Sequence, residues 1–186
     1  MKRGFLAACS LAASLALTSC IGGDFGMSFR ASVDETRPLP ANGEFSLENV
    51  NGTVELATWD EAKVRIEAVK HAASERALEE LRVEIVGEGD HLSVRTRYPR
   101  PRWMGGAGKV DYRVSVPRGA RVRVSNVNGR VEVDGVGAAL KASTVNGSVD
   151  VSGAGGEVEA SAVNGSVEVD MARVDVRKLQ AELRND

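Results

Sequence analysis

Acidic residues recur at one fixed place in the second half of the chain. Glu132, Asp150 and Glu168 are evenly spaced, and each lies four positions after the asparagine of a Val-Asn-Gly triplet. If these residues stack on neighbouring strands, their like charges destabilise the stack, and a hard cation such as Ca²⁺ can relieve the repulsion because it takes carboxylate oxygens. Solvent screening and the nearby basic residues Arg130, Lys141 and Arg177 are expected to do the same without a metal. We therefore expect no metal site and keep this column as a weak calcium candidate.

A basic segment from Arg95 to Arg123 is the second candidate site. It holds nine lysines and arginines and one acid, with aromatic residues between them. In a membrane-anchored protein, such a segment favours contact with anionic headgroups or lipopolysaccharide, with Arg100, Arg102 and Trp103 at its tip. The alternative, which we favour, is that the arginines pair with the acids of residues 75–90.

The chain offers no arrangement typical of catalysis. His71 and His91 have no neighbours at the spacing of metal ligands or of a catalytic triad, and we expect both on the surface. No serine has the context of a nucleophile elbow, and no glycine-rich segment follows a strand and opens a helix. We expect neither enzymatic activity nor a cofactor.

The N-terminus has the features of an export signal with a lipid attachment site. Lys2 and Arg3 precede an apolar run over residues 5–16, which is too short to span a membrane. The segment Leu17-Thr18-Ser19-Cys20 resembles the lipobox of bacterial lipoproteins, which implies that Cys20 becomes the lipidated first residue. The alternative is an ordinary signal peptide cut near Ser19. Residues 1–19 are thus the expected signal peptide, and residues 20–42 are the lipidated cysteine and a flexible tether.

The residues after the signal are mildly acidic, with 22 Lys and Arg against 26 Asp and Glu. This balance argues against nucleic-acid binding. Their number is enough for a single domain with its own core, which we place at residues 43–186. Cys9 would leave with the signal, so Cys20 has no cysteine partner for an internal disulfide.

A repeat over residues 127–169 must position these side chains. The phrase Val-Asn-Gly-x-Val-x-Val occurs three times with an 18-residue period, and its Asn-Gly pairs are Asn128 and Gly129, Asn146 and Gly147, and Asn164 and Gly165. A unit of this length accommodates two short strands and two turns. The fold class predicted from this spacing is all-β, a short parallel β-solenoid in which the asparagines stack as an amide ladder. A meander of hairpins is the alternative, because Asn-Gly is also a hairpin signal.

Other segments frame this repeat. Asn51 opens an earlier copy of the phrase, with Glu55 in the acidic position, but its interval from Asn128 is not a multiple of the repeat period. A short helix over residues 74–81, with Ser74 as its N-cap, and a hairpin over residues 83–96 are expected to flank one end of the stack. The repeats, about residues 121–178, decay toward the C-terminus. There Leu179 and Leu183 fit a short amphipathic helix over the open end, or the open edge pairs with another chain.

The order of these features resembles the bacterial "putative adhesin" family of unknown function. It runs from Val-Asn-Gly-x-Val-Glu through Trp59-Asp60, the short helix, the hairpin and Val114-Ser115-Val116-Pro117 to the tandem repeats, and it covers roughly residues 45–170. The resemblance implies a non-catalytic β-solenoid domain of the cell envelope. This chain departs from the family pattern by having few repeats.

Together these features predict a lipid-anchored binding or structural module of the bacterial envelope. Because Ile21 follows Cys20 where the inner-membrane sorting signal has an aspartate, the outer membrane is favoured in a Gram-negative cell. The expected partners are the membrane, through the anchor, and a protein or glycan of the envelope. An envelope-sensing regulatory protein and a polysaccharide-acting β-helix enzyme are the alternatives.

Overall fold

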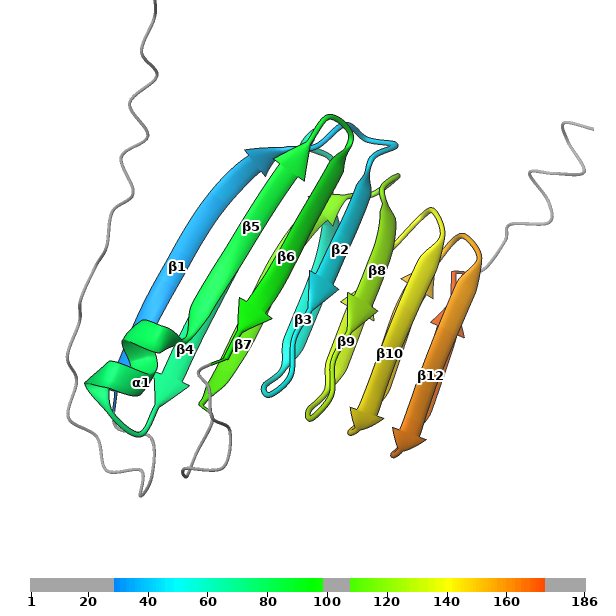
Figure 1. Ribbon diagram of the computed structural model, residues 1–186. Helices are drawn as coiled ribbons and strands as arrows, with labels where there is room; N and C mark the ends of the chain where they lie inside the picture. The colour runs from blue at the N-terminus through cyan, green and yellow to red at the C-terminus, as the bar shows by residue number, and fades with distance from the viewer. Residues whose placement is uncertain (1–28, 99–107, 173–186) are drawn as a thin grey trace, which may run out of the picture.

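The computed structural model describes residues 29–98 and 108–172, which form β-strands apart from one short helix and the connecting turns (Figure 1). The elements are β1 (Phe29–Pro38), β2 (Glu44–Glu48), β3 (Val54–Trp59), β4 (Lys63–Ala72), α1 (Glu75–Glu80), β5 (Arg82–Glu88), β6 (His91–Arg97), β7 (Lys109–Pro117), β8 (Arg121–Ser125), β9 (Val131–Asp134), β10 (Leu140–Asn146), β11 (Val149–Ala154), β12 (Val158–Asn164) and β13 (Val167–Met171). The prediction of an all-β chain with one short helix is confirmed.

The strands build two sheets that lie face to face (Figure 1). Sheet A has the order β1-β4-β7-β3-β9-β11-β13, and sheet B has the order β12-β10-β8-β2-β6-β5. Both sheets are mixed: the pairs β1–β4, β4–β7 and β5–β6 are antiparallel, and the other pairs are parallel.

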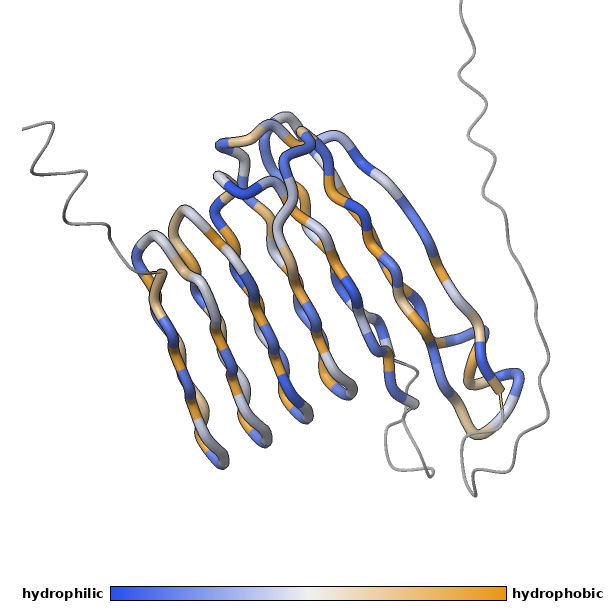
Figure 2. The backbone as a smooth tube through the Cα atoms, turned by 180° about the vertical axis from the view of Figure 1, so that it is seen from behind, coloured by the Kyte–Doolittle hydropathy of each residue, from blue (hydrophilic) through white to orange (hydrophobic). Residues whose placement is uncertain are grey.

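The core lies between the sheets because apolar and polar residues alternate along the strands. Side chains on a strand point alternately to its two faces, and Figure 2 shows the matching alternation of orange and blue along the chain. In β9, Val131 and Val133 are buried while Asp134 is exposed. The largest fully buried side chains come from both sheets and from the segments that close the ends: Phe45, Leu39, Leu47, Ile66, Leu81 and Leu92.

The 18-residue period of the sequence sets the register of strand pairing, because residues 18 positions apart pair across neighbouring strands. In sheet A, Val131 pairs with Val149, and Val149 pairs with Val167. In sheet B, Leu140 pairs with Val158. Each repeat unit gives one strand to each sheet, so consecutive strands such as β8 and β9 are not paired with one another. The hairpin alternative for the repeats is therefore wrong.

The early copy of the phrase lies directly beside the repeats. β2 pairs with β8 and β3 pairs with β9, both in parallel, and Asn51 forms a parallel bridge with Asn128. The intervening chain places β6 and β7 in parallel on the far side of β2 and β3. The antiparallel strands β1, β4 and β5 then complete that end of the sheets.

Two local predictions for the flanking section are confirmed. Helix α1 begins after Ser74, whose side-chain oxygen accepts a hydrogen bond from the Ala77 N–H at 3.2 Å. One turn of helix is stable here because Leu78 and Leu81 are buried in the end of the core. Strands β5 and β6 form the expected antiparallel hairpin.

The tether prediction is wrong for residues 29–38. These residues form β1, which pairs with β4 along its whole length. Every second side chain of β1, including Ala31 and Val33, is half-buried against the rest of the protein. The edge position lets the strand form although its sequence is largely polar.

Several predicted features lie outside the described residues. They are the signal peptide, the lipidation site Cys20, the loop tip with Arg100, Arg102 and Trp103, and the C-terminal segment with Leu179 and Leu183. Within residues 29–98 and 108–172, no helix has the length and apolar character needed to cross a bilayer.

Candidate binding face

The outer face of sheet A carries a continuous row of charged side chains. The strand registers place one residue from each of the seven strands in this row. We call it the acidic row: Asp34, Glu67, Arg113, Glu55, Glu132, Asp150 and Glu168. All members except Arg113 are acids. The predicted column of Glu132, Asp150 and Glu168 is therefore part of a longer feature, four of whose residues come from outside the three repeats.

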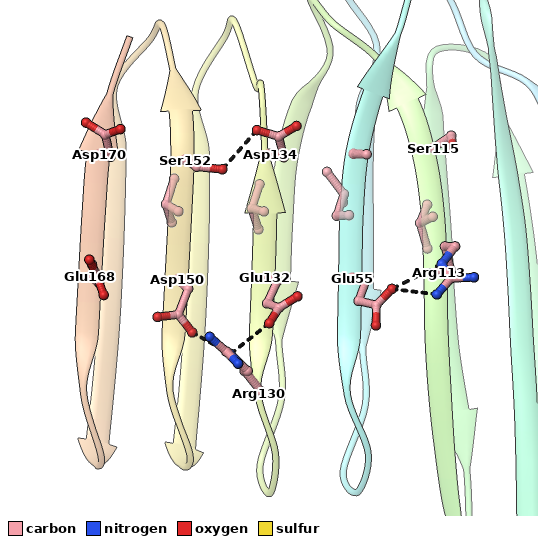
Figure 3. Close-up of a pocket in the computed structure, with 15 residues that line it drawn as sticks. Glu55, Arg113, Ser115, Arg130, Glu132, Asp134, Asp150, Ser152, Glu168 and Asp170 are labelled. Carbon is pink, nitrogen blue, oxygen red and sulfur yellow. Dashed lines mark hydrogen bonds and ion pairs between the residues drawn. The ribbon is translucent and has the colours of Figure 1, made fainter.

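Three arginines offset part of this charge. Arg65 contacts Asp34 and Glu67 at 2.9 and 3.1 Å. Arg130 lies between two neighbouring acids of the row, with its Nε 2.8 Å from both Glu132 and Asp150 (Figure 3). The hydrogen bond from Arg130 lowers the pKa of Asp150, and the same bond raises the pKa of Arg130. Arg113 donates to Glu55 at 2.9 Å. These pairs are exposed, so solvent screens them, and they set the positions of the side chains more than the stability of the fold.

Acidic charge is in excess at the end of the row near β13. A shallow groove of about 600 Å³ crosses this part of the face. Six acids line it against the two arginines Arg113 and Arg130: Glu55, Glu132, Asp134, Asp150, Glu168 and Asp170. Among the residues that the structure describes, no cation forms an ion pair with Glu168 or Asp170. The groove therefore presents negative charge to solvent, from an open sheet face.

At the acidic column that was the weak calcium candidate, the guanidinium group of Arg130 occupies the position a cation would take. Like charges on adjacent strands would need a partner, and Arg130 supplies it for Glu132 and Asp150. Within the described part of the chain, no three His, Cys, Asp or Glu side chains are grouped so that they could hold a metal ion.

The predicted asparagines lie in one row at the turn that leads from sheet B to sheet A. The Nδ2 of Asn128 donates to Oδ1 of Asn51 at 2.8 Å, Asn146 donates to Asn128 at 2.8 Å, and Asn164 donates to Asn146 at 2.9 Å. At the other end, Asn51 donates to the Gly108 carbonyl at 3.2 Å. We call these four residues the asparagine ladder.

The glycines beside the ladder are required by close packing of successive turns. Gly129 and Gly147 have backbone φ angles of +134° and +152°, which residues other than glycine rarely adopt. A Cβ on Gly147 would collide with the carbonyl oxygen of Gly129, and one on Gly129 would collide with that of Gly52. Gly165 continues the same arrangement over Gly147.

A buried polar cluster, which the sequence did not predict, supports the first turn of the ladder. Thr96 donates to Asn49 Oδ1 at 3.0 Å, so the 2.6 Å contact between Thr96 and Tyr112 uses the Tyr112 hydroxyl as donor. Burial raises the pKa of Tyr112 above its ordinary value, and the hydroxyl stays neutral. Asn49 also donates to the Val110 carbonyl at 3.1 Å, and Tyr98 donates to Asn49. The sequence signal that could have found this cluster is the hydroxyl side chains at inward-facing positions of β6 and β7, Thr96 and Tyr112.

The two histidines have different environments. His91 is exposed, as expected, but His71 is buried, and that prediction is wrong. Its Nε2 lies 3.2 Å from Asp111 Oδ2, which also contacts Lys109 at 3.0 Å. Burial and the charge of Lys109 lower the pKa of His71, against the opposing effect of Asp111. The histidine is therefore held neutral in a structural pair.

Part of the basic segment pairs as we favoured. Arg97 contacts Glu84 of β5 at 2.8 Å. Arg95 pairs with Glu48 of β2 at 2.7 Å instead, and Arg113 pairs with Glu55. The arginines of the described strands are thus spread over both sheets, because β6 belongs to sheet B and β7 to sheet A.

Comparison with solved structures yields eleven matching chains, including the two described below. No family model matches the chain, and no curated protein matches it. A putative cell adhesion protein from Clostridium sporogenes ATCC 15579 is 6% identical, with 75% of this chain and 99% of that chain covered and a TM-score of 0.44. A putative adhesin from Parabacteroides merdae ATCC 43184 is 9% identical, with coverages of 76% and 96% and a TM-score of 0.28. Both similarities are too low to support an argument about this chain.

Proposed function

We propose that this protein is a non-catalytic binding module of the bacterial cell envelope, anchored by lipid at Cys20. In this proposal four two-strand units are successive coils of a short β-solenoid, of the adhesin-like kind that the sequence resembles. The units are β2 with β3, β8 with β9, β10 with β11 and β12 with β13. Their in-register stacking at an 18-residue period supports this interpretation. The module presents a rigid, open sheet face.

The observation that carries the binding role is the excess of acids on the outer face of sheet A. Six acids and two arginines line the groove, and they are fixed to five neighbouring strands. A rigid surface of one charge attracts partners of the opposite charge and accelerates their association. We infer that the groove contacts a cationic surface of an envelope protein or a cationic glycan.

The test uses crosslinking in intact cells, followed by purification of the protein and identification of what it captured. The face variant combines Glu55→Gln, Glu132→Gln and Asp150→Asn, which remove charge and keep side-chain size. The control variant combines Glu75→Gln and Glu88→Gln, two exposed acids on α1 and β5. A partner captured by the wild type and by the control, and lost from the face variant, is expected. Equal capture by all three proteins would refute the role of the face.

The anchor is tested separately. Cells that express the full chain are fed a fatty-acid analogue that carries a chemical tag, and labelling of the protein is compared with that of Cys20→Ala. Lipid attachment predicts that the wild type is labelled and fractionates with membranes, and that the variant does neither. An unlabelled wild-type protein would favour the ordinary signal peptide.

A further inference from the structure

The end of the stack formed by β12 and β13 differs from the rest of the core. Val149 and Val151 of β11 are 0% and 3% exposed, whereas Val167 and Val169, their neighbours on β13, are 43% and 41% exposed. Met171 is 47% exposed. Within the part of the chain that the structure describes, the apolar side chains of β13 that point between the sheets therefore have a neighbouring strand, β11, on one side only.

The backbone of β13 is equally open. Ser166 accepts a hydrogen bond from the Val149 N–H, so its polar groups face β11. Since the backbone groups of successive residues point to opposite sides of a strand, those of Val167 and Val169 point away from β11. An edge with free N–H and C=O groups is a template for pairing with a further strand.

The opposite edge of sheet A is protected, whereas no element within residues 29–98 and 108–172 protects this one. β1 carries charges of both signs, and Asp34 pairs with Arg65 of its neighbour at 2.9 Å. On β13 the outward side chains Glu168 and Asp170 are both acidic, and no described cation pairs with them. A second copy joined through β13 would place these acids against the same acids, which is unfavourable.

We propose that the β13 edge binds an extended segment of a partner protein in which apolar residues alternate with lysine or arginine. The apolar side chains cover Val167 and Val169 in the interior, the backbone continues sheet A, and the basic side chains pair with Glu168 and Asp170 on the outer face. This mode of binding, addition of a strand to a sheet edge, goes beyond the function proposed above. Because Glu168 and Asp170 also line the groove, loss of binding in the Val169→Pro variant described below separates strand addition from binding in the groove.

The test measures binding of two synthetic peptides to the full-length chain carrying Cys20→Ala, by calorimetry at low ionic strength. Each peptide has about seven residues, enough for one strand; in one valine alternates with lysine, and in the other with glutamate. We expect the lysine peptide to bind about tenfold more tightly, since two favourable exposed pairs replace two repulsive ones. Equal affinity for the two peptides, or no binding of either, would overturn the proposal.

Variants then locate the site. Glu168→Lys with Asp170→Lys is expected to reverse the preference between the peptides, while Glu75→Lys with Glu88→Lys, at the other end of the molecule, leaves it unchanged. Val169→Pro removes the Val169 N–H, which points away from β11, and leaves the hydrogen bonds between β11 and β13 in place. It is expected to weaken binding of the lysine peptide about tenfold. Unchanged preference in the charge-reversal variant refutes the site even if the proline variant misfolds.

Two other occupants of the edge are distinguished in the same experiment. If Leu179→Ser with Leu183→Ser strengthens peptide binding about tenfold or more, the chain's own C-terminal segment is the occupant. If the protein without peptide sediments as a dimer that Glu168→Lys disrupts or strengthens, a second copy is the occupant. Either result overturns the proposal of a partner strand.

Discussion

Replacement of an inner member of the asparagine ladder is expected to cost more stability than replacement of the last member. Asn146 donates one side-chain hydrogen bond to Asn128 and accepts one from Asn164, at 2.8 and 2.9 Å. The side chain of Asn164 makes only the bond to Asn146 among the residues described. Asn146→Ala therefore removes two bonds and Asn164→Ala removes one, at positions that are otherwise alike in sequence and exposure.

The size of the effect follows from the number and exposure of these bonds. A hydrogen bond contributes about 0.5–1.5 kcal/mol net, and these side chains are exposed, so we take the lower half of that range. Asn146→Ala should then lower the free energy of unfolding by about 1–2 kcal/mol and Asn164→Ala by about 0.5–1 kcal/mol. At roughly 2–4 °C per kcal/mol for a domain of this size, the two midpoints should differ by about 1–4 °C.

Urea denaturation of the two variants and of the double variant measures the free energies of unfolding, and thermal unfolding of the same proteins measures the midpoints. The double variant should cost about the same as Asn146→Ala alone, because the bond between the two residues is already lost. Equal losses from the two single variants would refute the ladder as a source of stability. Asn51→Ala is not a mild control, contrary to what its isolated position in the sequence suggests, because Asn51 donates to Gly108 and accepts from Asn128.

Three further predictions concern other parts of the fold. Gly147→Ala should lower the free energy of unfolding, measured in urea, more than Gly89→Ala; both have positive φ, but a Cβ meets backbone only at Gly147. Stability should be greatest above about pH 6.5, the ordinary pKa of histidine. It should fall as the pH drops below that value, because the unfolded chain takes up a proton that buried His71 resists. In His71→Gln, the thermal midpoint should therefore depend less steeply on pH in this range. Tyr112→Phe removes the donor to Thr96 and should cost about 1 kcal/mol in urea, and no change would show that water replaces the hydroxyl.

The part of the fold with a strict period was predictable from the sequence. Identical residues at Val131, Val149 and Val167 fix both the register and the buried face, since a shift of one residue would turn every side chain to the other face. The same argument placed Glu132, Asp150 and Glu168 in one outward column. It could not supply Asp34 or Glu67, because no sequence spacing relates antiparallel strands to a parallel repeat.

The remaining features depend on contacts between distant segments. The interval from Asn51 to Asn128 is not a multiple of the repeat period, because the chain builds β4 to β7 before it returns. β1 escaped detection because its inward residues include Glu35 and Arg37, which pair with each other at 2.7 Å. His71 contacts Asp111 and pairs across strands with Lys109, and both are far away in sequence.

Because β6 and β7 lie beside β2 and β3 on one side, further repeat layers can be added only on the other side. Among the described residues, α1 and the antiparallel strands lie on one side of the Asn51 layer, and the layers on the other side repeat with an 18-residue period. An in-frame duplication of residues 135–152 would add one layer, lengthening the molecule by about 4.8 Å and leaving every other interface as it is. The length of such a protein is therefore a quantity that gene duplication can adjust in equal steps, without redesign of its core.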